Sequence, residues 1–178
     1  MDITFHAITA EAAQTLTSWR YPAPYDTYNV SIGDEQAALT EMLDARSPWF
    51  VAFDADGAPM GYCCFGTAAA VGWQGEPRLW TTDDKTLSIG LGLRPDLTGQ
   101  HLGLPFFTAI MDFAAEQFAP EAFRLFVLPF NRRAIRVYER AGFQHVCAHV
   151  VNAGSTQGLL YLEMRREATR KSGSKNGQ

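Results

Sequence analysis

Asn131 and Tyr138 are two residues whose types and spacing could do chemistry together. Both lie in the segment NRRAIRVYERAGF (Asn131–Phe143), about two helical turns apart and close to one helical face. Asn131 can cap the start of a helix, or its amide can hydrogen-bond a carbonyl or N–H of a ligand. The hydroxyl of Tyr138 can donate a proton to a departing thiolate if it reaches the sulfur atom. Taken alone, a tyrosine at such a position is more often an amphipathic residue at the edge of a core.

A second segment, LRPDLTGQHLGLPFF (Leu93–Phe107), has the pattern of a strand, a turn and a helix that begins near Gly103. Exposed N–H groups at a helix start, with the helix dipole behind them, form a site for an anion. Gly99 and Gly103 would let a phosphate approach the main chain closely, whereas Pro105 removes one N–H donor. A glycine-bearing turn of this kind is about as often merely structural, so this segment predicts an anion site only together with other features.

Familiar nucleotide-binding loops do not account for this turn. The pair Gly90 and Gly92 lies inside an expected strand and is followed by Arg94 and Pro95, so no GxGxxG pattern is present. The chain also lacks GxxxxGK[ST]. Both alternatives therefore miss their defining residues.

The combination Nxx(A)xxxYExxGF, placed one strand after the glycine turn, resembles the GNAT family of acetyl-CoA-dependent N-acetyltransferases. The resemblance covers residues 3–165 and is most specific over residues 93–143. It implies an acyltransferase that moves an acetyl group from acetyl-CoA, its co-substrate, to a primary amine within a ternary complex. The amine would belong to a small molecule, a protein N-terminus or a lysine side chain.

The resemblance also implies roles for particular residues. The turn Thr98–Gly103 would hold the CoA pyrophosphate through backbone N–H groups, and the strand Ile89–Leu93 would align the pantetheine and polarise the acetyl carbonyl. Asn131 would contact the pantetheine arm and Tyr138 would be the general acid. Arg133 or Arg136 would approach the adenosine 3′-phosphate, although a solvated basic helix face explains either arginine equally well. The cofactor-binding residues expected on this basis are Leu91, Leu93, Gly99, His101, Gly103, Leu104, Asn131 and Arg133.

The turn departs from the family pattern [QR]xxGx[GA] at two of its three defining positions. These positions are Thr98, His101 and Gly103, of which only the last matches. Thr98 removes a side-chain donor, but most phosphate bonds in such a loop come from the backbone. His101 stands where glycine is usual, so it either crowds the pyrophosphate or adopts a strained φ. We expect His101 still to present its N–H, with the imidazole turned outward or donating to a phosphate.

The acceptor is less defined by the sequence than the donor. An attacking amine must lose protons, often through water to a carboxylate. The candidate bases are Asp26, Glu76, Asp83 and Asp84, each of which is more often a solvated loop charge. The aromatic residues of the segment before residue 30 either form a wall around a cationic amine or anchor their loop to the core; they are Trp19, Tyr21, Tyr25 and Tyr28.

The hydrophobic patterns predict an α/β (α+β) fold in the order βααββ–βα–βα–ββ. Together with the family resemblance, this order implies a mixed, mostly antiparallel central sheet of about six to seven strands flanked by helices, a GNAT-like acyl-CoA acyltransferase fold. Strands are expected at Ile3–Ile8, Trp49–Asp54, Pro59–Gly66, Thr86–Leu93, Phe123–Leu128, Phe143–Val151 and Gly158–Arg165, and helices after Thr9, after Asp34, at Gly103–Phe118 and at Arg132–Ala141. The segment Arg20–Val30 reads as an ordered loop, and Thr67–Lys85 has no clear assignment.

The chain as a whole sets further bounds. Its 178 residues fit one domain, expected at 1–167, with a polar tail at 168–178 that is expected to be disordered. A net charge of −4 argues against nucleic acid as a partner. Neither a bilayer-spanning stretch nor a signal peptide is expected, so a cytoplasmic setting is predicted. A homodimer is common in such folds but is not encoded here.

Three cysteines give no sign of a disulfide framework or a metal site. Cys63 and Cys64 are adjacent in an expected buried strand, on alternate faces, and no CxxC spacing occurs. Cys147 has no base partner that the sequence alone reveals. We therefore expect no metal and no cysteine nucleophile.

Two other functions remain open from the sequence. The first is a non-catalytic acyl-CoA-binding or interaction module, which Thr98 and His101 favour and which Asn131 and Tyr138 oppose. The second is an ordinary α+β domain with no CoA site.

Overall fold

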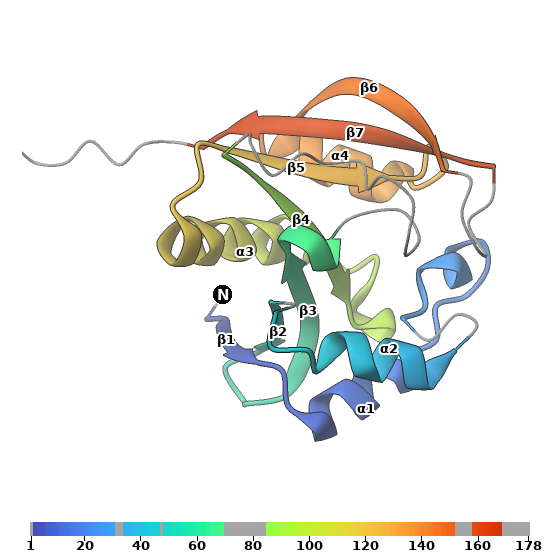
Figure 1. The fold of residues 1–178 in the computed structure, drawn as a ribbon, viewed down its shortest axis with the longest axis vertical. Helices are drawn as coiled ribbons and strands as arrows, with labels where there is room; N and C mark the ends of the chain where they lie inside the picture. Colours follow the sequence, from blue (N-terminus) through green and yellow to red (C-terminus); the bar gives the residue numbers. More distant parts are fainter. Residues whose placement is uncertain (1, 31–33, 47, 70–84, 152–157, 169–178) are drawn as a thin grey trace, which may run out of the picture.

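A computed structural model describes residues 2–30, 34–46, 48–69, 85–151 and 158–168 (Figure 1). Within them a seven-stranded sheet has the order β1-β2-β3-β4-β5-β7-β6. The strands are β1 (Thr4–Ala7), β2 (Trp49–Phe53), β3 (Pro59–Phe65), β4 (Thr86–Leu93), β5 (Ala122–Val127), β6 (Gln144–Val151) and β7 (Leu159–Glu167). The helices are α1 (Ala10–Ser18), α2 (Glu35–Met42), α3 (Gly103–Phe118) and α4 (Arg132–Arg140), with short 3₁₀ turns η1 (Tyr25–Tyr28), η2 (Gly66–Ala69) and η3 (Pro95–Leu97).

The order of elements confirms the sequence prediction, and local signals explain the helix boundaries. The Thr9 hydroxyl accepts a hydrogen bond from the Ala12 N–H at 3.2 Å and so starts α1. Asp34 starts α2 in the same way. Beyond α4, Gly142 has a φ of 88°, the left-handed conformation that ends many helices. The assignments left open at Thr67–Lys85 and the predicted tail fall largely outside the described residues.

Strand pairing is antiparallel throughout the described sheet except between β4 and β5. This parallel pair is short, since Thr86, Leu87 and Ser88 are the β4 residues in register with β5. Both strands continue beyond the paired region, β4 to Leu93 and β5 to Val127. Figure 1 shows the two strands diverging from their paired ends. The fold is thus the predicted mixed, mostly antiparallel sheet with helices on it.

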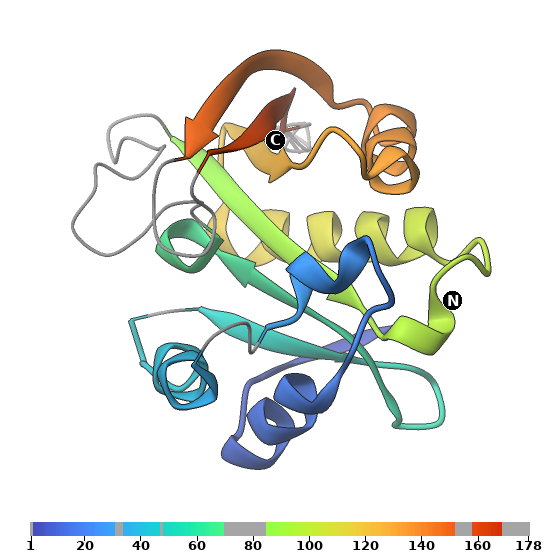
Figure 2. The same cartoon turned by 90° about the vertical axis from the view of Figure 1, so that its right-hand side faces the viewer.

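Helices cover both faces of the N-terminal half of the sheet. Leu16 of α1 and Met42 of α2 are buried against Val51 and Tyr62 on one face. On the other face α3 packs into the main core, which also receives Tyr138 from α4. Figure 2 shows α1 and α2 on one side of β2 and β3, with α3 on the other. The two cysteines of β3 are buried, as expected.

The buried stripe of α3 differs from the predicted one at its two ends. Helical spacing predicts a face made of Leu104, Phe107, Met111, Ala114 and Phe118. The middle three are buried, whereas Leu104 is half-buried and Phe118 is 39% exposed. Phe106 and Ile110 are buried as well. The cause lies in the sheet, because Gly61 of β3 leaves a space that the Phe106 ring fills: a Cβ at Gly61 would lie 2.4 Å from that ring. Helical periodicity gives the face of a helix, but the surface opposite decides its exact orientation.

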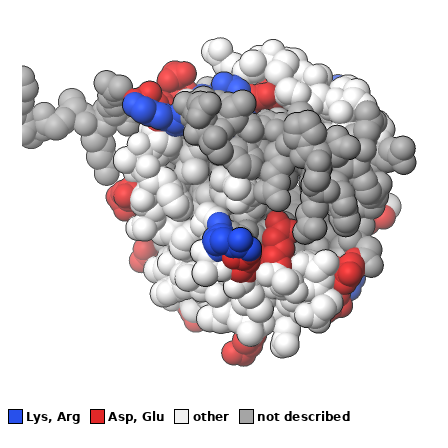
Figure 3. Space-filling model, viewed as in Figure 1, with Lys and Arg blue, Asp and Glu red and all other residues white. Residues whose placement is uncertain are grey.

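The charged side chains of the described residues are mixed in sign on one face of the molecule (Figure 3). On the face shown in Figure 3, the acidic and basic side chains of the described residues are scattered rather than gathered into a basic stripe. No helix among the described residues is long and apolar enough to cross a bilayer.

Candidate active site

The divergence of β4 from β5 is the central feature of the candidate site. From Ile89 onward β4 remains paired with β3, where Leu91 lies opposite Cys63 and Leu93 opposite Gly61. Its other edge has no register with β5 beyond Ser88. Backbone N–H and C=O groups on such an edge need partners. This edge of β4 is the one to which the family resemblance assigns the pantetheine arm.

The loop of residues 20–30 is attached to both diverging strands at their carboxyl ends. The Tyr21 hydroxyl donates a hydrogen bond to the Leu93 carbonyl at 2.7 Å, at the end of β4. The Tyr28 hydroxyl accepts one from the Leu128 N–H at 3.2 Å, just after β5. Burial raises the pKa of both phenols, so they stay protonated at neutral pH. Of the two readings that the sequence left open for the aromatic residues, the structure supports anchoring for Tyr21 and Tyr28.

Trp19 and Tyr25, the other two aromatic residues of this segment, contact different parts of the protein. Trp19 packs in the cluster of α1 and α2, with its ring centroid 6.5 Å from that of Tyr62. The ring of Tyr25 lies 4.1 Å below the guanidinium carbon of Arg133 and 5.8 Å from the ring of Phe130. Its π-face is therefore used by a cation of the protein itself.

Asn131 caps α4, as one of the two sequence interpretations proposed. Its Oδ1 accepts a hydrogen bond from the Ala134 N–H at 3.2 Å. The Asn131 side chain also hydrogen-bonds Tyr28, which lowers the pKa of that phenol against the larger effect of burial. One amide thus joins the start of α4 to the loop that spans the two strands.

Tyr138 is buried on the face of α4 that packs into the core. Its side chain is 9% exposed, and its ring centroid lies 4.9 Å from that of Phe107 in α3. Burial raises the pKa of its hydroxyl well above the usual range, and the nearby Tyr28 adds to the effect. A phenol in this environment holds its proton, which suits a proton donor and not a base.

The turn between β4 and α3 has the strained backbone that the sequence suggested. Gly99 has a φ of 80°, and His101 has a φ of 63° with an exposed side chain. Histidine is one of the residues that adopt this left-handed region with least difficulty. The exposed side chain agrees with the outward orientation, one of the two expected for this imidazole. Thr98 is used within the turn, where its hydroxyl donates to the Pro95 carbonyl at 2.8 Å.

The start of α3 leaves main-chain donors at the turn. Leu102 precedes the helix and supplies no side-chain cap. The first helical hydrogen bond runs from the Phe106 N–H to the Leu102 carbonyl at 3.0 Å, and Pro105 has no N–H. Helix geometry therefore leaves the N–H groups of Gly103 and Leu104 without intrahelical partners. A helix start with such donors and no acidic residue in its first turn is suited to an anion.

Arg133 brings α4 to the same turn. A Cβ placed on Gly99 would lie 4.0 Å from Nη1 of Arg133. Gly103 brings the helices together as well, since a Cβ there would lie 3.1 Å from a methyl group of Val137. Of the two arginines considered from the sequence, Arg133 is therefore the one that the structure places beside the turn. Arg136 is exposed on α4.

The glycines of β4 have a packing role. A Cβ at Gly92 would lie 2.3 Å from the ring of Tyr62, and one at Gly90 would lie 2.6 Å from Sγ of Cys64. These residues therefore let β3 side chains lie flat across β4. The GLGL pattern is strand packing and not a nucleotide loop, as the sequence indicated.

Of the four candidate bases, Asp26 is the one that the structure describes. Asp26 is exposed in η1, between Tyr25 and Tyr28. Glu76, Asp83 and Asp84 lie outside the described residues.

Sequence reasoning did not consider Glu163, which is 3% exposed in β7 and forms an ion pair with Arg165. Cys147 also differs from expectation, because His149 and Glu163 contact its thiol. No linear motif marks these residues, since they come from two strands.

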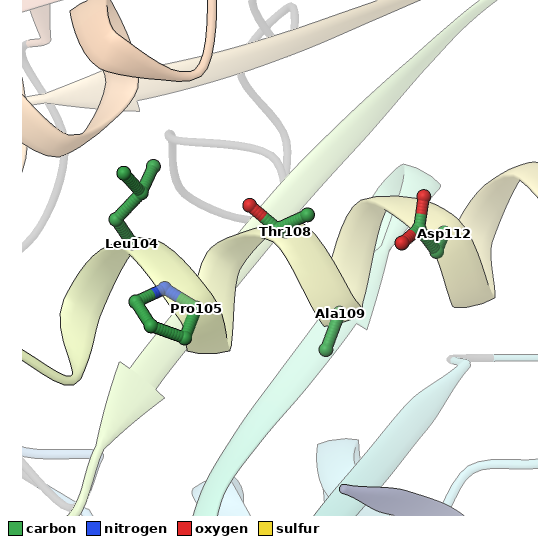
Figure 4. Close-up of a pocket in the computed structure, with 5 residues that line it drawn as sticks. All are labelled: Leu104, Pro105, Thr108, Ala109 and Asp112. Carbon is green, nitrogen blue, oxygen red and sulfur yellow. The ribbon is translucent and has the colours of Figure 1, made fainter. Parts of the chain in front are cut away.

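A shallow hollow of about 430 Å³ runs along α3 (Figure 4). Its lining comes from one helix face only, namely Leu104, Pro105, Thr108, Ala109 and Asp112. Groups from a single helix face do not converge on a ligand, and the hollow shares only Leu104 with the candidate site.

A comparison with family models decides the family. The model of the acetyltransferase (GNAT) domain matches residues 2–144. The chain belongs to the GNAT acetyltransferase family. It is accordingly an acyltransferase by family, as the motif around Asn131 and Tyr138 predicted. No curated protein matches this GNAT sequence.

Solved structures share the GNAT fold at low sequence identity. An aminoglycoside acetyltransferase AAC(6′)-Ib in complex with ribostamycin and coenzyme A has a TM-score of 0.70 at 19% identity, covering 94% of each chain. A spermidine N-acetyltransferase SpeG chimera from Vibrio cholerae and hSSAT has a TM-score of 0.64 at 14% identity, covering 93% of this chain and 95% of that one. A putative phosphinothricin N-acetyltransferase has a TM-score of 0.65 at 14% identity, covering 94% and 99%. These likenesses confirm the architecture.

Proposed function

We propose that this GNAT protein transfers an acetyl group from acetyl-CoA to a primary amine by direct attack within a ternary complex. The observation that carries the proposal is the divergence of β4 from β5 beyond Ser88, between a turn suited to phosphate and a buried tyrosine. The reacting domain is residues 1–167. The solved AAC(6′)-Ib structure with coenzyme A supports the choice of donor.

The residues at the carboxyl end of β4 suit a pyrophosphate. Gly99 has no side chain, its φ is positive, and Arg133 lies beside it. The N–H groups of Gly103 and Leu104 complete a set of donors at the start of α3, and His101 adds its own N–H while its ring is exposed. The pantetheine arm would then run along the edge of β4 past Leu93 and Leu91, near the Asn131 amide.

The proposed chemistry requires one proton donor and one proton acceptor. The amine nitrogen attacks the thioester carbonyl carbon, the C–S bond breaks, and the amide C–N bond forms. The departing thiolate takes a proton from Tyr138, the new amide nitrogen loses its extra proton to water, and the Tyr138 phenolate then regains a proton from water. The raised pKa of Tyr138 keeps the phenol in its protonated form at neutral pH, before the transfer. Among the four carboxylates considered, Asp26 is the one that lies within the described residues, and Asp26→Asn tests it as the final acceptor.

The first experiment separates binding from turnover. Thermal shift with acetyl-CoA measures binding, and release of free thiol measures turnover against a panel of amines. The panel should hold aminoglycosides, polyamines, amino acids and peptides with a free N-terminus or lysine, since AAC(6′)-Ib and SpeG are named for the first two classes. Stabilisation by acetyl-CoA together with thiol release for one class supports the proposal.

A non-catalytic acyl-CoA-binding module is the second candidate. It is favoured by Tyr21, whose hydroxyl occupies the Leu93 carbonyl at the end of the strand expected to hold the thioester. Binding of acetyl-CoA without thiol release over the whole panel would support this function. Absence of any thermal shift with acetyl-CoA would contradict both candidates.

A further inference from the structure

Three different metal-ligating atoms converge on β6 and β7, outside the candidate active site. They are Sγ of Cys147, Nε2 of His149 and Oε2 of Glu163. The sulfur lies 3.2 Å from the histidine nitrogen and 3.4 Å from the carboxylate oxygen, and the nitrogen and oxygen are 2.7 Å apart. The three atoms form a compact triangle with one thiol, one imidazole and one carboxylate at its corners.

Strand geometry explains why these residues meet. Cys147 and His149 are two positions apart in β6, so their side chains lie on the same face of the strand. Glu163 of β7 is the direct register partner of Cys147 and therefore shares that face. The ring of His149 is held edge-on to Phe126 of β5, with centroids 5.8 Å apart.

The contacts do not have the geometry of a nucleophilic relay. In a Cys–His–carboxylate relay one imidazole nitrogen faces the thiol and the other faces the carboxylate. Here Nε2 of His149 contacts both Cys147 and Glu163. Convergence of three donor atoms on one region is instead what a single bound cation requires.

We propose that Cys147, His149 and Glu163 bind one Zn²⁺ ion, which links the edge strand β6 to β7. Zinc takes sulfur, nitrogen and oxygen ligands at about 2.3, 2.0–2.1 and 2.0–2.2 Å in a tetrahedral arrangement. In a tetrahedron those lengths place sulfur about 3.6 Å from the other two ligand atoms, and nitrogen about 3.4 Å from oxygen. The two distances from sulfur, 3.2 and 3.4 Å, are within about 0.4 Å of that separation. The nitrogen–oxygen distance has to widen by about 0.7 Å as the ion replaces the hydrogen bond between them.

The surroundings of Glu163 support a ligand role. Its side chain is 4% exposed, and its second oxygen, Oε1, accepts a hydrogen bond from Arg165. Arg165 therefore orients the carboxylate so that Oε2 faces Cys147 and His149, as partners beyond the direct ligands do in metal sites. Binding of Zn²⁺ releases the thiol proton to solvent, and the charges of thiolate and carboxylate then balance those of the ion. Three protein ligands leave a fourth position for water.

The test measures Zn²⁺ binding to the whole chain, freed of any tag and treated with chelator. Calorimetric titration with zinc sulfate is expected to give one ion per chain, and cobalt chloride is expected to give the absorption of a thiolate-bound Co²⁺. Cys147→Ser and His149→Gln should each weaken Zn²⁺ at least tenfold, and Cys147→Ser should also abolish the thiolate band. His145→Gln is the matched control, because His145 is an exposed histidine on the same strand.

Circular dichroism of each variant shows whether the fold is kept. A variant that has lost its fold is replaced by Cys147→Ala or His149→Asn. An independent test uses the unmutated chain, in which bound Zn²⁺ should protect the Cys147 thiol against alkylation. No saturable binding, unchanged affinity in folded Cys147 and His149 variants, or loss of binding in His145→Gln would overturn the proposal. Acetyl-CoA turnover is read separately, so failure of the metal site leaves the acetyltransferase proposal intact.

Discussion

The Tyr21 hydroxyl and the Leu93 carbonyl, 72 residues apart in the chain, form a 2.7 Å hydrogen bond at the end of β4. This bond attaches the loop of residues 20–30 to the first of the two diverging strands, while Tyr28 attaches it to the backbone just after the second. Two phenol groups of one loop therefore bind the chain at the carboxyl ends of the two diverging strands. The link explains why a segment with two prolines and three tyrosines is ordered.

Removal of the Tyr21 hydroxyl tests that link. Tyr21→Phe should lower the free energy of unfolding by about 1 kcal/mol, because it deletes one hydrogen bond and leaves the Leu93 carbonyl short of a partner. Urea denaturation measures the change. Tyr25→Phe is the control, since it also removes a phenol hydroxyl from the loop but keeps the ring below Arg133. Equal effects of the two variants would contradict the assigned role of Tyr21.

Tyr138→Phe tests the proton donor. We expect kcat to fall by roughly 10–10³-fold, the usual contribution of a proton-transfer group, with little change in acetyl-CoA affinity. Steady-state kinetics and thermal shift measure the two quantities. Tyr161→Phe, at a buried tyrosine of β7, should keep the rate. An unchanged kcat in Tyr138→Phe would remove this residue from the mechanism.

Arg133→Gln should weaken acetyl-CoA about tenfold or more, because a charge-assisted hydrogen bond to phosphate contributes about 1.5–3 kcal/mol. Arg136→Gln is the matched control on the same helix and should have little effect. Repeating the titration with dephospho-CoA identifies the phosphate. If wild type and Arg133→Gln differ in affinity for acetyl-CoA but not for dephospho-CoA, Arg133 contacts the 3′-phosphate. If the difference in affinity persists with dephospho-CoA, Arg133 contacts the pyrophosphate.

His101→Gly should stabilise the protein by about 1 kcal/mol, because glycine adopts a φ of 63° without the strain of a side chain. Acetyl-CoA affinity should change less than tenfold, since the exposed imidazole leaves the His101 N–H presented. The control is Ala119→Gly, which replaces another residue of positive φ, 45°, by glycine at the far end of α3, away from the turn. Tightening of acetyl-CoA binding by tenfold or more would show that His101 obstructs the site.

The buried tyrosines predict a stability loss in alkali. Burial raises the pKa of Tyr161 to about 12, from 10.0 in the unfolded chain. A phenol whose pKa is raised by folding stabilises fully below the unfolded pKa and loses that contribution as pH rises through the folded one. The free energy of unfolding should therefore fall between about pH 10 and 12. Urea denaturation across that window measures the slope, which should be smaller in Tyr161→Phe.

The identity of most elements could be predicted from local chemistry. Thr9, Asp34 and Asn131 each start a helix through a side-chain oxygen, and Gly142 ends α4 with a positive φ. These interactions join residues only a few positions apart, so the sequence near each helix end contains the signal. The motif of Asn131 and Tyr138 identified the family for the same reason, because both residues lie on one helix.

Contacts between distant segments were decided only in the folded chain. The rotation of α3 depends on the space above Gly61, and the role of Tyr21 depends on where β4 ends. Pairing of β6 with β7 places Glu163 opposite Cys147, a consequence of register that no spacing within either strand encodes. Local sequence determined which elements form, through short-range hydrogen bonds and periodicity. Tertiary packing determined which side chains meet, because shape and strand register are properties of two surfaces together.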